Sequence, residues 1–269
     1  MEFPVNRDSR YFTIAGFRAI LVRALDLGYR VVSFAHFEPP SDRPVLLLRH
    51  DLDRPLVGIE TIAEMEADLG VKASYFVQTA CEFYNLLSEE NRRLLRRLTT
   101  LGHEIGLHYE ARRYVGSGGE RTLLSDLRLL EDLCGHKIRS ASQHIPTDGE
   151  SIDIARYVAN DAYAPRFTQA PMTYISDSLM AWREATPHDL LDCRASFQFL
   201  SHPDTWTGSY EDMGAALDAM MRAEIEAVRH RYCDVKRHYE TLLRERAVRD
   251  RQFVERRNRP ARAIDSTER

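Results

Sequence analysis

The stretch that decides the fold is residues 45–53, with the sequence VLLLRHDLD. A short, nearly continuous apolar run that ends in charged residues is typical of a strand buried on both faces, as in a parallel sheet. In parallel α/β folds the carboxyl ends of the strands form the active-site edge. The polar end of this stretch, RHDLD, is therefore the first place to look for chemistry.

On both sides of this strand, predicted helices and strands alternate along the chain. Strand, amphipathic helix, glycine and strand in succession is the signature of βα units in one parallel sheet. About six such units favour a barrel, complete or distorted, although an open doubly wound sheet shares the signature. By apolar periodicity, helices are expected at about residues 12–27, 57–69, 86–101 and 119–134, a weaker one near 150–160, and strands at 30–37, 72–78, 103–108, 137–144, 172–178 and 195–203.

Composition limits the class of protein. The 269 residues are 43% apolar and 29% charged, which fits one large globular domain or two small ones. A net charge of −4 argues against binding nucleic acid along the whole chain. Four scattered cysteines without a CxxC pair indicate reduced thiols. With Glu2 and Asp8 where a signal peptide needs a basic start, and no long apolar run, we expect a cytoplasmic protein without an integral membrane segment.

The region after about residue 210 differs from the rest. From Glu211 to Arg257 it has no proline and a single glycine, Gly214, which predicts one or two long helices. Their apolar stripe is expected to pack against the barrel or to join two copies as a homo-oligomer. We predict two domains, a barrel domain at residues 1–209 that includes the N-terminal helix and strand, and a helical extension with a basic tail at 210–269. The stripe consists of Leu217, Met220, Met221, Ile225, Val228 and Tyr232.

Polar residues gather where the predicted strands end. Histidine and aspartate beside an open position are the ligands of catalytic zinc, and similar sets hold other divalent ions. This collection predicts metal-assisted hydrolysis. The residues at successive strand ends are Arg49, His50, Asp51 and Asp53, then His108 and Glu110, then His144, then Asp177, and finally His202.

Asp51 and Asp53 are two residues apart, so on an extended strand they project to the same side. Two carboxylates that close repel each other unless a cation lies between them or one is protonated. One can bind a metal while the other acts on its water. The alternative is that the pair caps the helix that follows.

Six stretches, in this order, resemble the NodB-like polysaccharide deacetylases of carbohydrate esterase family 4, and are closest to the WbmS-like branch. The resemblance covers about residues 45–206. It implies a distorted (β/α)7 TIM-like barrel, the NodB homology fold, which is a glycoside hydrolase/deacetylase-type barrel. The stretches are LLLRHDLD (46–53), KASYFV (72–77), GHEIGLHYE (102–110), SASQHIP (140–146), YISDSLMAW (174–182) and FLSHP (199–203).

The resemblance also implies roles. It implies a divalent metal, usually zinc, and removal of an N-acyl group from an amino sugar or hydrolysis of a related carbon–nitrogen bond. Asp51 matches the general base, Asp53 and His108 match metal ligands, and His202 matches the general acid. Asp177 and Trp182 match the fourth motif, and with Arg49 and Glu110 they are predicted to contact a small-molecule or saccharide substrate.

The second motif departs from the family pattern. The family has two histidines four residues apart on the metal, but the residue four after His108 is Arg112. A guanidinium does not ligate zinc. We predict that the third ligand is His144, with Glu110 as the alternative. A second hypothesis is a metal-poor relative that binds a glycan or a partner enzyme without turning it over.

Overall fold

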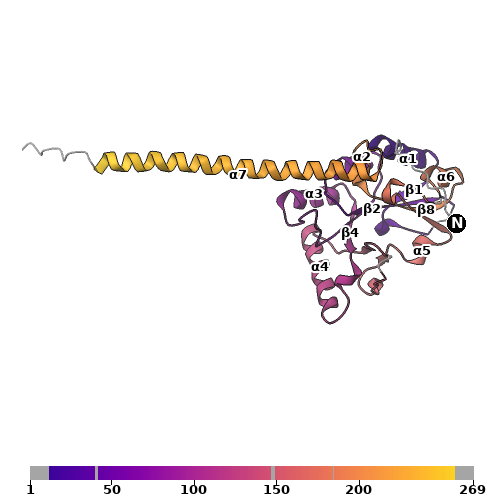
Figure 1. Cartoon of the computed structure of the whole chain (residues 1–269). Coiled ribbons are helices and arrows are strands. Elements are labelled where there is room, and N and C mark those ends of the chain that lie inside the picture. The colour runs from indigo at the N-terminus through magenta and orange to yellow at the C-terminus, as the bar shows by residue number, and fades with distance from the viewer. Residues whose placement is uncertain (1–11, 40–41, 147–148, 184, 258–269) are drawn as a thin grey trace, which may run out of the picture. The chain divides into compact units, whose positions relative to one another are not determined.

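The computed structural model describes residues 12–39, 42–146, 149–183 and 185–257 (Figure 1). These residues divide into two compact units, one ending at Ala216 and the other beginning at Leu217. The first unit is built on one parallel sheet, and the second is helical. The domain boundary predicted near residue 210 stays a prediction.

The sheet has its strands in the order β6-β5-β4-β3-β2-β8-β7, with β1 paired to β2 beside this path. Every pairing is parallel. The strands are β1 (Arg30–Val32), β2 (Val45–Leu52), β3 (Ser74–Val77), β4 (Glu104–Tyr109), β5 (Ser140–Gln143), β6 (Asn160–Asp161), β7 (Met172–Ser176) and β8 (Ser196–Ser201). The stretch at residues 45–53 thus supplies β2, which pairs with β1, β3 and β8 and is buried along its whole length.

Helices cover the outside of the sheet and connect its strands (Figure 1). The predicted helices between strands are confirmed, because α2, α3 and α4 follow β2, β3 and β4 in turn. Side-chain capping begins three of the helices, through Thr13 at α1, Ser88 at α3 and a Thr186–Asp189 capping box at α6. The helices of this unit are α1 (Ile14–Asp26), α2 (Ile59–Asp68), α3 (Glu89–Thr100), α4 (Gly119–Cys134), α5 (Pro165–Thr168) and α6 (Pro187–Asp192).

The barrel is distorted between β6 and β7, the two ends of the strand path. Residues near α5 fill this side, where the Gln198 side-chain amide of β8 donates to the carbonyls of Ala162 (3.0 Å) and Phe167 (3.1 Å). The predicted fold class, a distorted parallel barrel with a long C-terminal helix, is therefore confirmed.

Two predicted elements were wrong. Residues 150–160 form only a 3-10 turn at Ile154–Arg156, because Asn160 pairs with Ser140 as strand β6. The strand predicted at 30–37 ends at Val32. Its next residues turn away because the Phe34 N–H donates to Ser74 Oγ and not to a neighbouring strand (2.8 Å).

The barrel interior is close-packed around Phe76, which belongs to a buried cluster with Phe34, Leu47 and Phe167. Gly106 in β4 lies against this ring. A Cβ atom at Gly106 would lie 2.4 Å from the Phe76 ring and 2.8 Å from the Ser140 carbonyl oxygen. Its φ is not positive, so the glycine is needed for space and not for an unusual backbone conformation.

The second unit consists of the greater part of α7 (Met213–Arg257), which is 45 residues long. It confirms the predicted long C-terminal helix. Large apolar side chains on it are exposed, including Ile225 at 60% and Tyr232 at 75%. None of the helices in the described residues combines the length and the apolar character needed to cross a bilayer.

Candidate functional site

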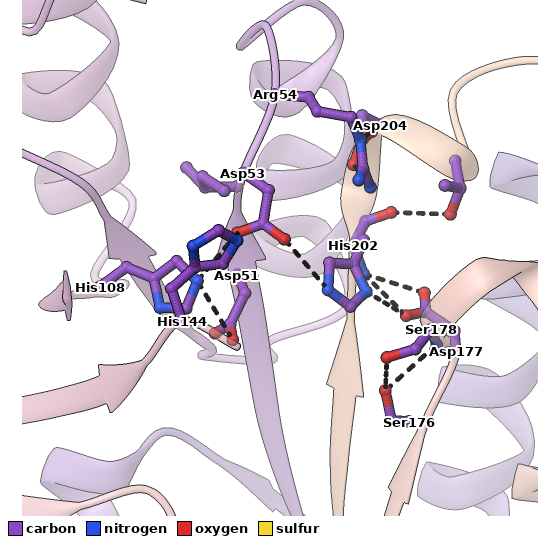
Figure 2. Close-up of polar contacts among 12 residues, drawn as sticks. Asp51, Asp53, Arg54, His108, His144, Ser176, Asp177, Ser178, His202 and Asp204 are labelled. Carbon is purple, nitrogen blue, oxygen red and sulfur yellow. Dashed lines mark hydrogen bonds and ion pairs between the residues drawn. The ribbon is translucent and has the colours of Figure 1, made fainter. Parts of the chain in front are cut away.

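The predicted site residues come together at the carboxyl edge of the sheet, around a cavity of about 710 Å³ (Figure 2). Asp51 is the penultimate residue of β2, and Asp53 follows the strand directly. His108 lies in β4, and His144 and His202 follow β5 and β8. Parallel strands bring residues that are up to 151 positions apart in sequence to one edge because all their carboxyl ends meet there.

Three imidazoles converge on the Asp53 carboxylate. Its Oδ1 atom lies 2.8 Å from His108 Nε2 and 3.7 Å from His144 Nε2, and its Oδ2 atom lies 3.5 Å from His202 Nε2. One ligand atom each from Asp53, His108 and His144 can be chosen so that all lie within 4.8 Å of one another. Zinc binds imidazole and carboxylate donors at about 2.0–2.2 Å, so this trio fits one such ion.

The other nitrogen of each imidazole is turned away from Asp53. Nδ1 of His108 lies 2.9 Å from the Ser142 carbonyl oxygen, and Nδ1 of His202 lies 2.6 Å from Asp177 Oδ1. Nδ1 of His144 is buried, has no hydrogen-bond partner among the described residues, and lies 3.6 Å from Glu110 Oε1. A partner at Nδ1 fixes the orientation of the ring and leaves Nε2 for a ligand, as in metal-binding histidines.

Charge and burial set the protonation of this cluster. Burial would raise the pKa of Asp53, but the hydrogen bond and charge of His108 hold it well below its usual range. Burial lowers the pKa of His144. Burial would also lower the pKa of His202, yet Asp177 and Asp53 outweigh it and raise that pKa to about 9. At neutral pH the site therefore holds an ionised Asp53, a neutral His144 and a protonated His202.

Asp51 is held from behind by Arg49, two residues earlier on the same strand. Arg49 Nε donates to Asp51 Oδ1 (2.9 Å) and Nη2 donates to Oδ2 (2.6 Å). Ser142 Oγ donates to Asp51 Oδ2 as well (3.1 Å). Burial would raise the pKa of Asp51, but the Arg49 charge and the approach of His108 lower it. The result is an ionised carboxylate fixed beside the Asp53 cluster.

The structure corrects the role predicted for Arg49. Its side chain is fully buried, its guanidinium lies 4.5 Å from the Tyr163 ring centroid, and Nη1 donates to Gln198 Oε1 (3.0 Å). Arg49 is also not among the residues that line the cavity, so it has no contact with a substrate bound there. Arg49 instead orients Asp51.

The predicted substrate contact of Trp182 is also not what the structure shows. Only 3% of it is exposed, and its ring lies 5.5 Å from the Phe12 ring and 5.7 Å from the Phe199 ring, between centroids. Trp182 therefore belongs to the core and does not line the cavity. Its part in the site is to anchor the loop that follows β7.

Asp177 and Glu110 lie near the cluster but have partners in the protein. The Asp177 carboxylate accepts from the backbone N–H of His202 (2.9 Å) and from Trp206 Nε1 (2.6 Å), besides the His202 ring. Glu110 accepts from Arg112 Nε (2.8 Å). Their predicted contact with a substrate stays a prediction.

Sequence reasoning missed two residues that shape the site, Ser142 and Tyr163. Ser142 supplies its carbonyl to His108 and its hydroxyl to Asp51. A signal was present, since Ser142 stands two residues before His144 in the strand predicted at 137–144, and that spacing puts both side chains on one face. Tyr163 accepts from Arg49 through its hydroxyl (3.1 Å) and follows the two-residue strand β6, which has no pattern to detect.

No protein-family model and no curated protein sequence matches the chain. Solved structures do. A family 4 carbohydrate esterase from Bacillus anthracis is 14% identical, with a TM-score of 0.42 over 78% of this chain and 86% of that one. The polysaccharide deacetylase Bc1974 from Bacillus cereus is 15% identical, with a TM-score of 0.39 over 69% and 89%.

A third match is BA3943, described as a CE4 family pseudoenzyme from Bacillus anthracis, at 19% identity and a TM-score of 0.39 over 68% of this chain. The chain covers 60% of that protein's length. The family that the sequence motifs resemble is thus also the family of these structures, and none of the descriptions bears on the WbmS-like branch. At identities below 20%, the chemistry of this chain has to be inferred from the geometry of its own site.

Proposed function

We propose that this protein is a metal-dependent hydrolase that removes an N-acyl group from an amino sugar, or cleaves a related non-peptide carbon–nitrogen bond, in saccharide metabolism. The observation that carries the proposal is the convergence of three histidine Nε2 atoms within 3.7 Å of the Asp53 carboxylate, beside a second carboxylate held separately. Asp53, His108 and His144 would hold the ion, with zinc the best fit to two imidazoles and a carboxylate. When bound, the ion would act as a Lewis acid toward the amide carbonyl.

In this proposal Asp51 accepts the proton of the attacking water. It lines the cavity, and one of its oxygens lies 3.7 Å from His108 Nε2, so it borders the proposed ligand set. Arg49 holds both carboxylate oxygens and keeps the group ionised, as a base requires. The buried guanidinium also prevents rotation of the carboxylate.

His202 is the proposed acid on the other side of the cavity. An amide leaves poorly unless its nitrogen is protonated as the bond breaks. Asp177 fixes Nδ1 of His202 and keeps the ring protonated at neutral pH, so Nε2 can deliver the proton. Asp51 and His202 thus divide base and acid between β2 and β8, neighbouring strands of the sheet.

The test is metal analysis of the purified protein, together with acetate release from a panel of N-acetylated sugars and nucleotide sugars. We expect about one equivalent of zinc or a similar ion and acetate release from at least one member of the panel. A protein that binds a glycan, holds no ion and releases no acetate fits the second candidate, a metal-poor binding relative. Arg112 favours that candidate, because it stands where the family pattern has a ligand.

The third ligand can be tested separately. His144→Ala should abolish metal retention, because the neutral imidazole faces Asp53 Oδ1 at 3.7 Å. Glu110→Ala should retain the ion, since Glu110 Oε1 lies 3.6 Å from His144 Nδ1, the nitrogen turned away from Asp53. Full occupancy in the His144 variant, or loss in the Glu110 variant, would exchange the two assignments.

We further propose a cytoplasmic location and self-association through α7. Apolar residues recur along the helix at alternating steps of three and four, which is the pattern of a coiled-coil seam. All seven are 40–75% exposed: Met221, Ile225, Val228, Tyr232, Val235, Tyr239 and Leu242. Light scattering should show a dimer or larger assembly that Ile225→Asp converts to a monomer.

A further inference from the structure

The cavity is lined by charged side chains that almost all have a partner of opposite charge. Asp51 pairs with Arg49, Asp53 with His108, Asp177 with His202, and Arg54 with Asp204. These pairs leave little free charge for a ligand. The exception among the charged lining residues is Arg183.

Arg183 lines the cavity and is exposed. Within the described part of the chain its guanidinium makes no hydrogen bond, ion pair or ring contact. A guanidinium presents several N–H donors in a fixed plane, which suits a carboxylate or phosphate group bound through two hydrogen bonds. Because the guanidinium is unpaired among the described residues, it is available for an anion that enters the cavity.

The segment that presents Arg183 is fixed at two points. At its start, the Asp177 carboxylate binds the backbone and ring of His202. At its end, Trp182 is buried among aromatic rings directly before Arg183. Arg183 is thus placed at the cavity by the same loop that holds the proposed acid, and both face one ligand-binding space.

We propose that the substrate of this site carries an anionic group, a carboxylate or a phosphate, which Arg183 binds while the N-acyl group lies at the Asp53 cluster. The inference rests on the proposed function for the position of the N-acyl group. A neutral N-acetylated sugar would offer the guanidinium no group of opposite charge. The substrate class is accordingly an acidic or phosphorylated N-acyl amino sugar.

Calorimetric titration of the purified full-length protein tests this with three probes. They are N-acetylglucosamine, N-acetylglucosamine 1-phosphate and N-acetylglucosaminuronic acid. We expect at least one anionic probe to bind about tenfold more tightly than the neutral sugar, as for one charged hydrogen-bonded contact. Tighter binding of the phosphate or of the carboxylate identifies which anion the site takes.

Arg183→Gln should remove this preference and leave the affinity for N-acetylglucosamine unchanged. The matched control is Arg128→Gln, an exposed arginine on α4 that does not line the cavity. Repeating the titration with a chelator separates binding by Arg183 from binding by an ion. Equal affinities for all three probes, or a preference that persists in Arg183→Gln, would overturn the inference.

Acetate release separates this inference from the proposed function. Arg183-dependent binding of an anionic probe without acetate release from any substrate would refute the hydrolase and leave the anion site standing. Equal acetate release from neutral and anionic probes, unaffected by Arg183→Gln, would refute the anion site and leave the hydrolase standing.

Discussion

Two clusters of histidine and carboxylate lie on opposite sides of the same strand, and only one of them faces the cavity. The open cluster consists of Asp53 and the three histidines around it, His108, His144 and His202. The sealed cluster surrounds Glu66, which lies 2.7 Å from His50 Nε2 through Oε1 and accepts from the Tyr75 hydroxyl through Oε2 (2.6 Å). His50 Nδ1 lies 2.6 Å from Ser201 Oγ.

The sealed cluster has the Ser–His–Glu connectivity of a nucleophilic triad, yet all of its members are completely buried. Alternation along β2 explains the separation, since His50 points toward the helices while Arg49 and Asp51 point into the barrel. In the sealed cluster each side-chain polar atom of His50 and Glu66 has a protein partner. In the open cluster only His108 Nε2 lies at hydrogen-bond distance from Asp53 (2.8 Å), while Nε2 of His144 and Nε2 of His202 lie 3.7 Å and 3.5 Å from the same carboxylate. Both clusters contain histidine and a carboxylate. The open cluster is the candidate reactive site because it is accessible from the cavity and its polar atoms can still bind a ligand.

Removing the carboxylate of the open cluster should have the largest effect. Asp53→Asn should reduce bound metal from about one equivalent to none and acetate release to background, because the anionic ligand is lost. The free energy of unfolding of the metal-free protein should also fall, because the ionised Asp53 carboxylate accepts a hydrogen bond from His108. The control is Asp51→Asn, which should keep the ion while losing turnover. Metal retained in Asp53→Asn would contradict the ligand assignment.

The next effect concerns the proposed acid. His202→Ala should keep the metal and lower turnover of an N-acetyl substrate by roughly 10²–10⁴. An activated ester should be affected far less, because its alkoxide leaves without protonation. Near-wild-type amide hydrolysis would rule out the acid role. Loss of the ion would instead make His202 a ligand and exchange its role with that of His144.

Substitutions in the sealed cluster should lower the stability of the protein and leave its metal content unchanged. Glu66→Ala leaves two buried groups, His50 Nε2 and the Tyr75 hydroxyl, without their partner. Unpaired buried groups cost about 1–3 kcal/mol each, so unfolding in urea should show a loss of roughly 2–5 kcal/mol. Metal content in the folded protein should not change. Glu66→Gln keeps a hydrogen-bond acceptor and should lose less stability than Glu66→Ala. Equal losses of stability in the two variants would contradict the structural role of the Glu66 hydrogen bonds.

The smallest effect expected is a pH dependence of the metal-free protein. The pKa of His202 is raised to about 9 in the folded state from 6.5. A raised pKa stabilises the fold fully below the unfolded value, and this contribution is lost as pH rises through the folded value. Between about pH 6.5 and 9, metal-free wild type should therefore lose up to about 3 kcal/mol relative to His202→Ala. Parallel stability curves for the two proteins would contradict the charged His202–Asp177 pair.

Much of the fold could be predicted because its helices and strands have strong, separate periodicities. Residues 45–53 and the three helices that follow show this clearly. Short elements such as β6 could not be predicted, since two residues carry no period and their conformation depends on pairing with Ser140. The polar residues of the site could be predicted as a group, because strand ends share one edge.

Their individual roles could be predicted less well. Arg49 and Trp182 look polar or amphipathic in sequence, and only tertiary packing shows that both are enclosed. The sequence did not identify the partner that orients Asp51. Here it comes from the same strand as Asp51 itself, two residues earlier.

The close packing around Gly106 predicts that a substitution there would make the protein temperature-sensitive. The Phe76 ring that fills the space of a Cβ there also lies 5.7 Å from the Arg49 guanidinium, measured to the ring centroid. A methyl group at this position would overpack the interior at a cost of about 1–3 kcal/mol. For a domain of this size each kcal/mol lowers the melting temperature by about 2–4 °C. Gly106→Ala is therefore a candidate conditional allele, with which a cell could keep the protein at low growth temperature and lose it on warming.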